Sequence, residues 1–497
     1  MADGVSDWAL PTMSAAEVIA AGRSLTAPFR LDVVTAAAGE SVLDPSILEA
    51  SILEASTLDC VEILRLLPGR RVVARARLAG MQCLVKLFVG SGARRYFTRE
   101  RRGLERLRDC SVPTPELLGC FNLSSGGGFG LVLEWLVDAQ PVAEHDHDGF
   151  VQIVAGLARL HRASITQSDP HLHNYLKTAD GRVFAVDGDG VNWWPALSRR
   201  RALANLGLLL AQLPPAEDGR LLTACAEYDR IRWQSTLSDA FLAEVGRHLR
   251  RQRRGRTRRY LAKTLRECSE FHCERTRQRF LVCVRAVWNE AMAEFAADPE
   301  AAFTDARNPA EVLKEDNSAT VIRASIGDAT YVIKRYNLKS RVHGMRRALR
   351  PMPRYRASWR NGHRLRFLGL RGARPVALLE YRSGFAQTIA YLVMEDLGSD
   401  ASDLATWVAE RGASSELTDK VATLFRGIAD AELVHGDTKA SNFLIHAAEI
   451  YLIDLDSMVE GRRGLARDVS RFLTNWESDP EIHEQFRGAL QAVGMPL

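Results

Sequence analysis

Short apolar runs rich in strand-forming residues recur in two widely separated parts of the chain. In the first half these runs lie at 72–74, 84–88 and 131–133, and a charged stretch at 94–108 separates the last two. Runs of this length and composition predict β-strands. The charged stretch predicts a helix, which should end before Pro113 because proline cannot continue a helix.

The same order of elements recurs in the second half. Strand-like runs at 321–322, 331–334 and 391–393 surround a basic helical stretch at 354–368. After the last of these strands in each half, the pattern becomes mainly helical. We therefore predict an α+β fold of two tandem domains with one architecture. Each domain should contain a small antiparallel sheet with one helix, followed by a mainly helical lobe.

Composition suggests where these domains begin and end. Residues 1–60 are rich in Ala and Ser and predict a helical or loosely packed extension, whereas 298–309 is rich in small, acidic and turn-forming residues. The predicted parts are the extension at 1–60, a first domain at 61–300 with lobes at 61–135 and 136–300, a junction at 301–310, and a second domain at 311–497 with lobes at 311–395 and 396–497.

Composition and charge narrow the class of protein. The 497 residues are 46% hydrophobic and 26% charged, as in ordinary globular proteins. The 8 cysteines form no C-x-x-C pair, and the N-terminus lacks a signal peptide, so we expect a cytoplasmic protein with reduced thiols. No apolar run approaches the roughly 20 residues of a membrane span. A net charge of +5 is too mild to indicate a nucleic-acid partner.

The strongest motif is the segment 435–442, which reads H-x-D-x-x-x-x-N. This is the catalytic-loop pattern of kinases. In that chemistry Asp437 accepts the proton of the attacking hydroxyl, and Asn442 holds a metal ion beside the phosphates. Lys439 is placed to neutralise charge on the transferred phosphoryl group. Asp454 ends the next apolar strand, where a second metal-binding carboxylate is expected.

The first half repeats this constellation. Asp169 and Asn174 are also five residues apart, and Asp187 ends an apolar strand at 184–186. These three residues lie 267 or 268 positions before their counterparts in the second half. Asp and Asn are common in turns and helix caps, but two matched sets favour a function. We therefore predict Asp169 as a base, with Asn174 and Asp187 as metal ligands.

A strand lysine precedes each loop, as phosphate binding requires. Lys86 should be oriented by Glu100, with Glu105 as the alternative. Lys334 has no acidic residue on the helix that follows it, so either Asn361 serves weakly or this copy is degraded. We therefore predict that the first domain is the working copy and the second is weaker or regulatory.

Neither half contains G-x-G-x-x-G. The turn at 68–70 and Gly327 lie where we expect the hairpin that covers the phosphates.

Several of these segments resemble one known family. Residues 169–176, D-P-H-L-H-N-Y-L, are similar to the D-x-x-x-H-N-x-L loop of the lipopolysaccharide core kinases, which act on Kdo or heptose. Residues 184–189 and 452–456 are similar to the I-D-x-D element of that family. The resemblance covers about 61–200 and 311–460, although Gln167 stands where the first loop would carry His. It implies a protein-kinase-like fold, ATP with Mg²⁺, and phosphoryl transfer to a sugar of a lipopolysaccharide core precursor.

Two other functions stay open at this point. One is a protein or small-molecule phosphotransferase, since these motifs do not encode the acceptor. The other is a non-catalytic scaffold of two pseudokinase domains, which the missing glycine-rich loops favour.

A run of eight arginines lies between Arg247 and Arg259. By default such a run is a solvated helix face. The family resemblance favours contact with an anionic glycolipid or with the cytoplasmic surface of the inner membrane. We therefore predict a cytoplasmic protein with peripheral membrane contact.

Overall fold

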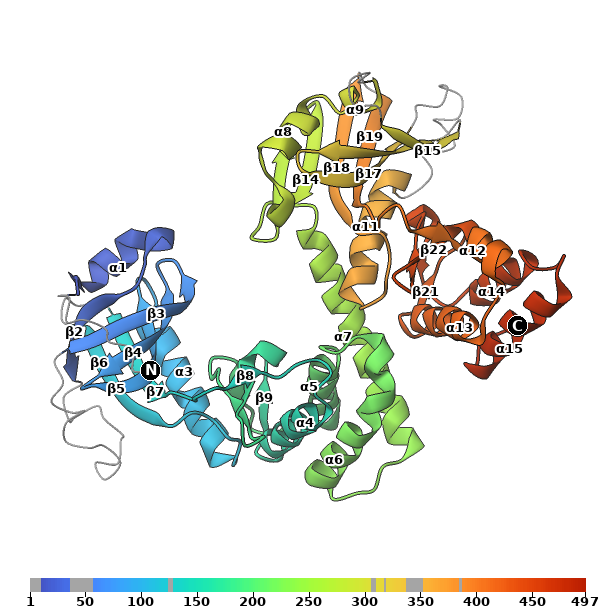
Figure 1. Cartoon of the computed structure of the whole chain (residues 1–497). Helices are drawn as coiled ribbons and strands as arrows, with labels where there is room; N and C mark the ends of the chain where they lie inside the picture. The colour runs from blue at the N-terminus through green and yellow to red at the C-terminus, as the bar shows by residue number, and fades with distance from the viewer. Residues whose placement is uncertain are drawn as a thin grey trace. The chain divides into compact units, whose positions relative to one another are not determined.

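The computed structural model describes residues 10–35, 57–123, 128–304, 310–316, 319–336, 352–383 and 387–497. The predicted α+β class is confirmed, and the chain forms two compact units (Figure 1). The first unit comprises Met1–Leu213 with Gly219–Arg253, and the second comprises Pro214–Asp218 with Arg254–Leu497. No helix in the described part of the chain combines the length and the apolar character needed to cross a membrane.

The first unit begins with a seven-stranded sheet in the order β1-β2-β3-β4-β5-β7-β6. Because β2 also pairs with β6, strands β2 to β7 form a closed ring around an apolar core. The sheet elements are β1 (Thr12–Met13), α1 (Ala15–Ala21), β2 (Phe29–Thr35), β3 (Thr57–Leu67), β4 (Arg71–Leu78), β5 (Met81–Val89), α3 (Ala93–Asp109), β6 (Leu117–Leu123) and β7 (Gly128–Glu134).

Part of the predicted N-terminal extension belongs to this sheet. Strand β2 pairs antiparallel with β3 and with β6. Its residues Phe29, Leu31 and Val33 alternate into the core and are buried, which is the period of a strand with one buried face. The Ala- and Ser-rich composition around β2 hides this short alternation, so the expectation of a loose extension is wrong for residues 29–35.

The remainder of the first unit is mainly helical, with short strands between the helices. These elements are β8 (Gln140–Pro141), α4 (His147–Arg162), β9 (Ile165–Gln167), β10 (Tyr175–Lys177), β11 (Val183–Ala185), β12 (Val191–Trp193), α5 (Arg199–Leu210), α6 (Leu221–Trp233) and α7 (Asp239–Lys263). Apolar side chains of α4, α5 and α6 form one core with residues of α3 and β7.

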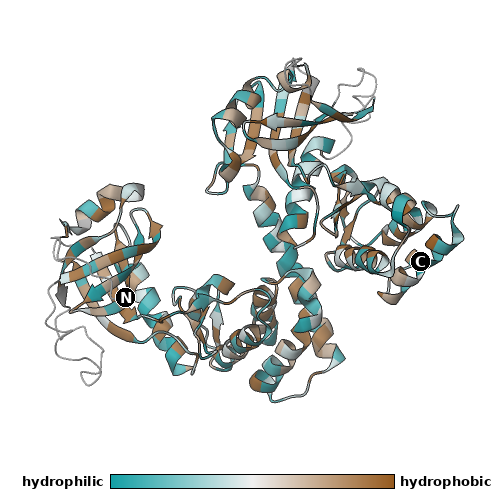
Figure 2. Ribbon diagram, in the orientation of Figure 1, coloured by the Kyte–Doolittle hydropathy of each residue, from teal (hydrophilic) through white to brown (hydrophobic). Residues whose placement is uncertain are grey.

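The second unit contains an open seven-stranded sheet in the order β13-β14-β18-β19-β17-β16-β15. Apolar and polar residues are interspersed along the strands of both sheets (Figure 2). The sheet elements are β13 (Phe271–Arg275), β14 (Arg279–Val284), α8 (Glu290–Ala297), α9 (Ala301–Thr304), β15 (Glu311–Asp316), β16 (Ala319–Ile326), β17 (Ala329–Tyr336), α11 (Arg354–Phe367), β18 (Pro375–Ser383) and β19 (Gln387–Glu395).

A mainly helical part follows β19 and carries several short strands. Its elements are β20 (Ser402–Asp403), α12 (Leu404–Arg411), α13 (Ser415–Asp430), β21 (Leu433–Val434), β22 (Phe443–His446), β23 (Glu449–Leu452), β24 (Val459–Glu460), α14 (Leu465–Thr474) and α15 (Pro480–Ala492). A cluster of buried aromatic and aliphatic side chains from α13, α14 and α15 forms its core.

The compact units divide inside α7, between Arg253 and Arg254. This division differs from the junction predicted at 301–310, of which 305–309 lie outside the described residues. Residues 271–284, expected in the first domain, form β13 and β14, and β14 pairs with β18 of the second sheet. The composition of the sequence does not mark this division. The division falls within the uninterrupted helix α7, where no turn-forming or linker-like segment occurs.

Helix α3 packs unusually closely against the loop that follows β11. A Cβ atom added to Gly103 would lie 1.8 Å from the carbonyl oxygen of Gly188, and one added to Gly188 would lie 2.4 Å from the carbonyl oxygen of Glu100. Real Cβ atoms do not approach backbone this closely. The two glycines therefore bring the helix that carries Glu100 into direct contact with the segment that carries Asp187.

We expect Gly103→Ala to destabilise the first unit by about 1–3 kcal/mol, the usual effect of overpacking. The matched control is Gly246→Ala in α7, where the nearest atom, at 3.2 Å, is the flexible end of Arg250. Alanine there should be neutral or stabilising by about 0.5–1 kcal/mol. Urea unfolding measures both changes, and equal stability of the two variants would contradict the close packing of α3.

Candidate functional site

The loop between β21 and β22 brings together the predicted base and the predicted metal ligands of the second unit. The side-chain amide nitrogen of Asn442 donates to the carbonyl oxygen of Asp437 at 2.9 Å. The N–H of Ile453 donates to the carbonyl oxygen of Asn442 at 3.0 Å. The first bond connects the two ends of the loop to each other, and the second joins the loop to the segment that leads into Asp454.

Asp468 on α14, which is not among the predicted site residues, holds this loop by hydrogen bonds. Its carboxylate accepts hydrogen bonds from the N–H groups of His435 at 2.7 Å and Gly436 at 3.0 Å. Its carbonyl oxygen accepts from the hydroxyl of Thr438 at 2.6 Å. Burial raises the pKa of Asp468, although the two N–H groups act in the opposite direction. A lone Asp on an amphipathic helix carries no sequence signal for this role.

His435 fixes the loop from its other side. Its Nε2 lies 3.1 Å from the carbonyl oxygen of Ile453, and its Nδ1 accepts from the N–H of Asp437 at 3.3 Å. Together these contacts assign the proton to Nε2, because a carbonyl can only accept. Burial lowers the pKa of His435, which favours the neutral ring that both bonds require.

Lys334 on β17 is paired with Asp454 and not with a residue of the helix. Its Nζ lies 2.6 Å from Oδ1 of Asp454. Burial lowers the pKa of Lys334, but Tyr336 and Asp454 outweigh burial, so the pKa lies above its ordinary value. The pKa of Asp454 lies below its ordinary value, because Lys334 outweighs the effect of burial. Both groups are therefore charged over a wide pH range.

Asp454 adopts a left-handed backbone conformation with φ 54° and ψ 54°. This conformation is costly for residues other than glycine and concentrates at functional sites. The next acidic residue of the D-x-D element, Asp456, pairs with Arg354 of α11. An arginine of α11 therefore pairs with this loop, although α11 has no acidic residue for Lys334.

Asn361 has a different role from the one proposed for it. Its side-chain nitrogen donates to the carbonyl oxygens of Leu455 at 2.8 Å and Met458 at 2.9 Å. It thus holds the short 3₁₀ turn at Leu455–Ser457 against α11 and does not orient Lys334.

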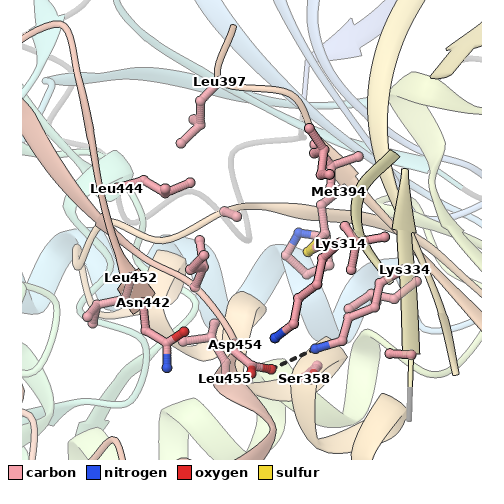
Figure 3. Close-up of a pocket in the computed structure, with 18 of the residues that line it drawn as sticks. Lys314, Lys334, Ser358, Met394, Leu397, Asn442, Leu444, Leu452, Asp454 and Leu455 are labelled. Carbon is pink, nitrogen blue, oxygen red and sulfur yellow. Dashed lines mark hydrogen bonds and ion pairs between the residues drawn. The ribbon is translucent and has the colours of Figure 1, made fainter. Parts of the chain in front are cut away.

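A pocket of about 590 Å³ lies between the sheet and the helical part of the second unit. Lys334, Asn442 and Asp454 all line it, and their side chains point towards one region (Figure 3). Residues 395–397, at the end of β19 and just after it, form another part of its wall. The apolar lining residues include Val321, Val332, Leu392, Met394, Leu444 and Leu452. Apolar walls with a few convergent polar groups are typical of small-molecule sites.

Asp437 lies beside this region and contacts one arginine. A guanidinium nitrogen of Arg471 on α14 lies 2.7 Å from Oδ1 of Asp437. Lys439, two residues further along the loop, is exposed. Arg471 is therefore a cationic side chain at the predicted base that no spacing in the sequence indicates.

The first unit holds its lysine differently. Lys86 on β5 forms a buried ion pair with Glu100 of α3, and it also donates to the carbonyl oxygen of Val186 at 2.6 Å. Glu100 accepts a further hydrogen bond from the N–H of Gly188 at 3.1 Å. Glu105 instead lies 3.6 Å from Arg101. Of the two predicted partners, Glu100 is therefore the one that contacts Lys86.

Asp187 lies close to this ion pair. Burial raises the pKa of Asp187, but Lys86, the hydrogen bond with Glu100 and Arg71 together outweigh burial, and the pKa ends below its ordinary value. The hydrogen bonds of the loop match those of the second unit. Asn174 donates to the carbonyl oxygen of Asp169 at 3.0 Å, and Val186 donates to the carbonyl oxygen of Asn174 at 2.9 Å.

Gln167 occupies the place of His435 and makes comparable contacts. Its amide nitrogen donates to the carbonyl oxygen of Asp187 at 3.3 Å, and its amide oxygen lies 3.5 Å from the N–H of Asp169. Asn205 on α5 holds the backbone of Gln167, accepting from its N–H at 3.0 Å and donating to its carbonyl oxygen at 2.6 Å. Amide side chains thus replace the His and Asp of the second unit.

The arginine run in α7 does not form a single solvated face. Arg253 is buried and donates to the carbonyl oxygen of Leu213 at 3.2 Å. Arg254 pairs with Glu432 at 2.7 Å. Other arginines of the run are exposed, namely Arg247, Arg250, Arg251, Arg258 and Arg259.

Residues 306–476 match the family model described as lipopolysaccharide kinase (Kdo/WaaP) family. The family resemblance seen in the motifs is therefore confirmed for this segment, which contains Lys334, Asp437, Asn442, Asp454 and Asp468. A search of curated proteins gave no significant match. The match lies within the second unit and implies a phosphotransferase.

We expect Asp468→Ala to destabilise the second unit by about 1–3 kcal/mol, because it leaves the buried N–H group of His435 without an acceptor and removes the acceptor of Gly436. Asp468→Asn keeps one side-chain oxygen and should cost clearly less. Urea unfolding of the two variants measures the difference. Wild-type stability of Asp468→Ala would show that the carboxylate does not hold the loop.

Proposed function

We propose that the second unit is an ATP- and Mg²⁺-dependent kinase that phosphorylates a sugar, heptose or Kdo, of the lipopolysaccharide core. The observation that carries this proposal is the convergence of Lys334, Asn442 and Asp454 in one pocket, within the segment that matches the kinase family. In the proposed reaction Asp437 accepts the proton of the sugar hydroxyl. Lys439 stabilises negative charge on the transferred phosphoryl group.

The donor atoms of the pocket fit a magnesium ion. The nitrogen of Asn442 is engaged with Asp437, so its side-chain oxygen is the atom that faces a cation, together with the carboxylate of Asp454. Oxygen donors of this kind suit the hard ion Mg²⁺. When bound there, Mg²⁺ would supply positive charge to the phosphate oxygens of the nucleotide. Lys334 then binds phosphate, and backbone groups of 395–397 bind the adenine.

We assign catalysis to the second unit, although the helix acid of the first had favoured the first domain. The pocket and the family match both support this reassignment. Lys334 lacks an acidic partner on α11, but Asp454 positions it instead. Positioning is most of what phosphoryl transfer requires of a protein.

We further propose that the two units are tandem copies of one protein-kinase-like architecture. Both show three strands, a helix and two further strands in the same order, and their loops share equivalent hydrogen bonds. The first unit would then be a regulatory pseudokinase. This role is favoured by the family match, which lies within the second unit.

A peripheral contact with the cytoplasmic face of the inner membrane belongs to the same proposal. The exposed arginines of α7 would attract anionic headgroups, each contributing on the order of 1 kcal/mol near the surface. The acceptor precursor would be presented at that surface.

The proposal predicts which aspartate matters for turnover. In the full chain, Asp437→Asn removes the base and should lower phosphorylation of purified lipopolysaccharide core by about 100-fold or more. The matched variant Asp169→Asn should stay near wild type. Mass spectrometry of the acceptor, with ATP and Mg²⁺ present, measures the phosphoryl gain.

Two other outcomes would change the assignment. Loss of activity in Asp169→Asn alone would move catalysis to the first unit. If the wild-type chain transfers no phosphoryl group to the core but gains thermal stability with Mg·ATP, another acceptor must be sought. No thermal shift and no transfer would favour the scaffold.

A further inference from the structure

Strand β15 is the edge strand of the second sheet and borders the pocket. All its residues are exposed, and among the described strands it pairs with β16 alone. The pairing register shifts between Val312, which faces Ile322, and Lys314, which faces Val321. Leu313 is therefore the extra residue of a β-bulge. Bulges of this kind re-aim side chains and are frequent beside active sites.

The bulge changes which side chains of β15 reach the pocket. In a regular strand, neighbouring residues point to opposite faces, yet Leu313 and Lys314 both line the pocket, as does Asp316. Figure 3 shows the Lys314 side chain extending towards Asp454, into the region that Lys334 also reaches. Lys314 therefore carries a positive charge to the place proposed for the phosphates.

The other cations that line the pocket are closely held by carboxylates. Lys334 pairs with Asp454 at 2.6 Å, and Arg354 pairs with Asp456. Arg323 contacts Glu311 at 2.7 Å and Asp396 at 3.1 Å. Lys314 differs, because its ion pair with Asp316 spans 3.7 Å and its side chain is 62% exposed. Its ammonium group can thus turn to a ligand with little loss of existing interactions.

We propose that Lys314, aimed into the pocket by the bulge at Leu313, is a second phosphate-binding lysine of the second unit. It would take over the role of the backbone N–H groups in a glycine-rich loop, a motif that the chain lacks. The inference rests on the proposed nucleotide binding by this unit. Leu313, which is 42% exposed, would cover the sugar or base of the same nucleotide from the edge of the sheet.

The position of Gly327 agrees with phosphate binding by a side chain of β15 and not by a glycine-rich turn. The prediction that Gly327 belongs to the hairpin that covers the phosphates is wrong, because Gly327 lies in the turn between β16 and β17. The hairpin next to the pocket is formed by β15 and β16, and its described strands contain no glycine. A side-chain cation from β15 is therefore the group that this hairpin offers to an anionic ligand.

Isothermal titration of the full chain with Mg·ATP, Mg·ADP and adenosine tests the proposal. The second-unit site is defined as the one whose ATP binding is lost in Lys334→Ala. In Lys314→Ala we expect ATP and ADP affinity at this site to fall by about tenfold, whereas adenosine affinity should stay within about twofold, because adenosine lacks phosphate. Lys314→Arg keeps the charge and should restore most of the ATP affinity.

The matched control is Lys420→Ala, which removes one positive charge at an exposed ion pair with Glu416 outside the pocket lining. It should leave ATP affinity unchanged. Equal ATP affinity of Lys314→Ala and wild type would overturn the role of Lys314 while leaving nucleotide binding intact. An equal loss for ATP and adenosine would also overturn it, since Lys314 would then only shape the pocket. If the wild-type chain binds no nucleotide, the proposed function itself fails.

Discussion

The arrangement of the second-unit site depends on one buried carboxylate. Asp468 accepts the N–H groups of two successive loop residues, His435 and Gly436, and so fixes the start of the segment that carries Asp437. Without that acceptor, the buried N–H group of His435 and the N–H group of Gly436 would each lose a hydrogen bond. The contacts of His435 with Ile453 and of Asn442 with Asp437 both form from a loop whose start is fixed in this way.

The first unit reaches the same loop geometry with neutral groups. Asn205 both accepts from and donates to the backbone of Gln167, whereas Asp468 can only accept. Gln167 in turn spans Asp169 and Asp187, as His435 spans Asp437 and Ile453. In both units a donor and an acceptor on one side chain hold the loop, and a neutral imidazole and an amide each supply that pair.

The two units differ in two respects. One is the partner of the strand lysine, and the other is the pairing of the first strand of the three that lead to it. Glu100 holds Lys86 from α3, and two glycines bring that helix against the loop. In the second unit Asp454 holds Lys334 directly. The first sheet closes on itself, so β3 has neighbours on both sides, whereas β15 is the edge strand of the described second sheet. The bulge at Leu313 on this edge strand places Lys314 in the pocket lining.

The sequence by itself determined the α+β class and the strand lysines, because runs of strand-forming residues are a local signal. It also determined the contact of Asn174 with Asp169 and of Asn442 with Asp437, because spacing within a short loop fixes which groups meet. Tertiary structure decided the rest. Lys334 meets Asp454 across 120 positions, and Asp468 meets His435 across 33. The closure of the first sheet by β2 and the bulge in β15 depend on strand register. Contacts of this kind arise from the packing of distant segments, which no local pattern of residues records.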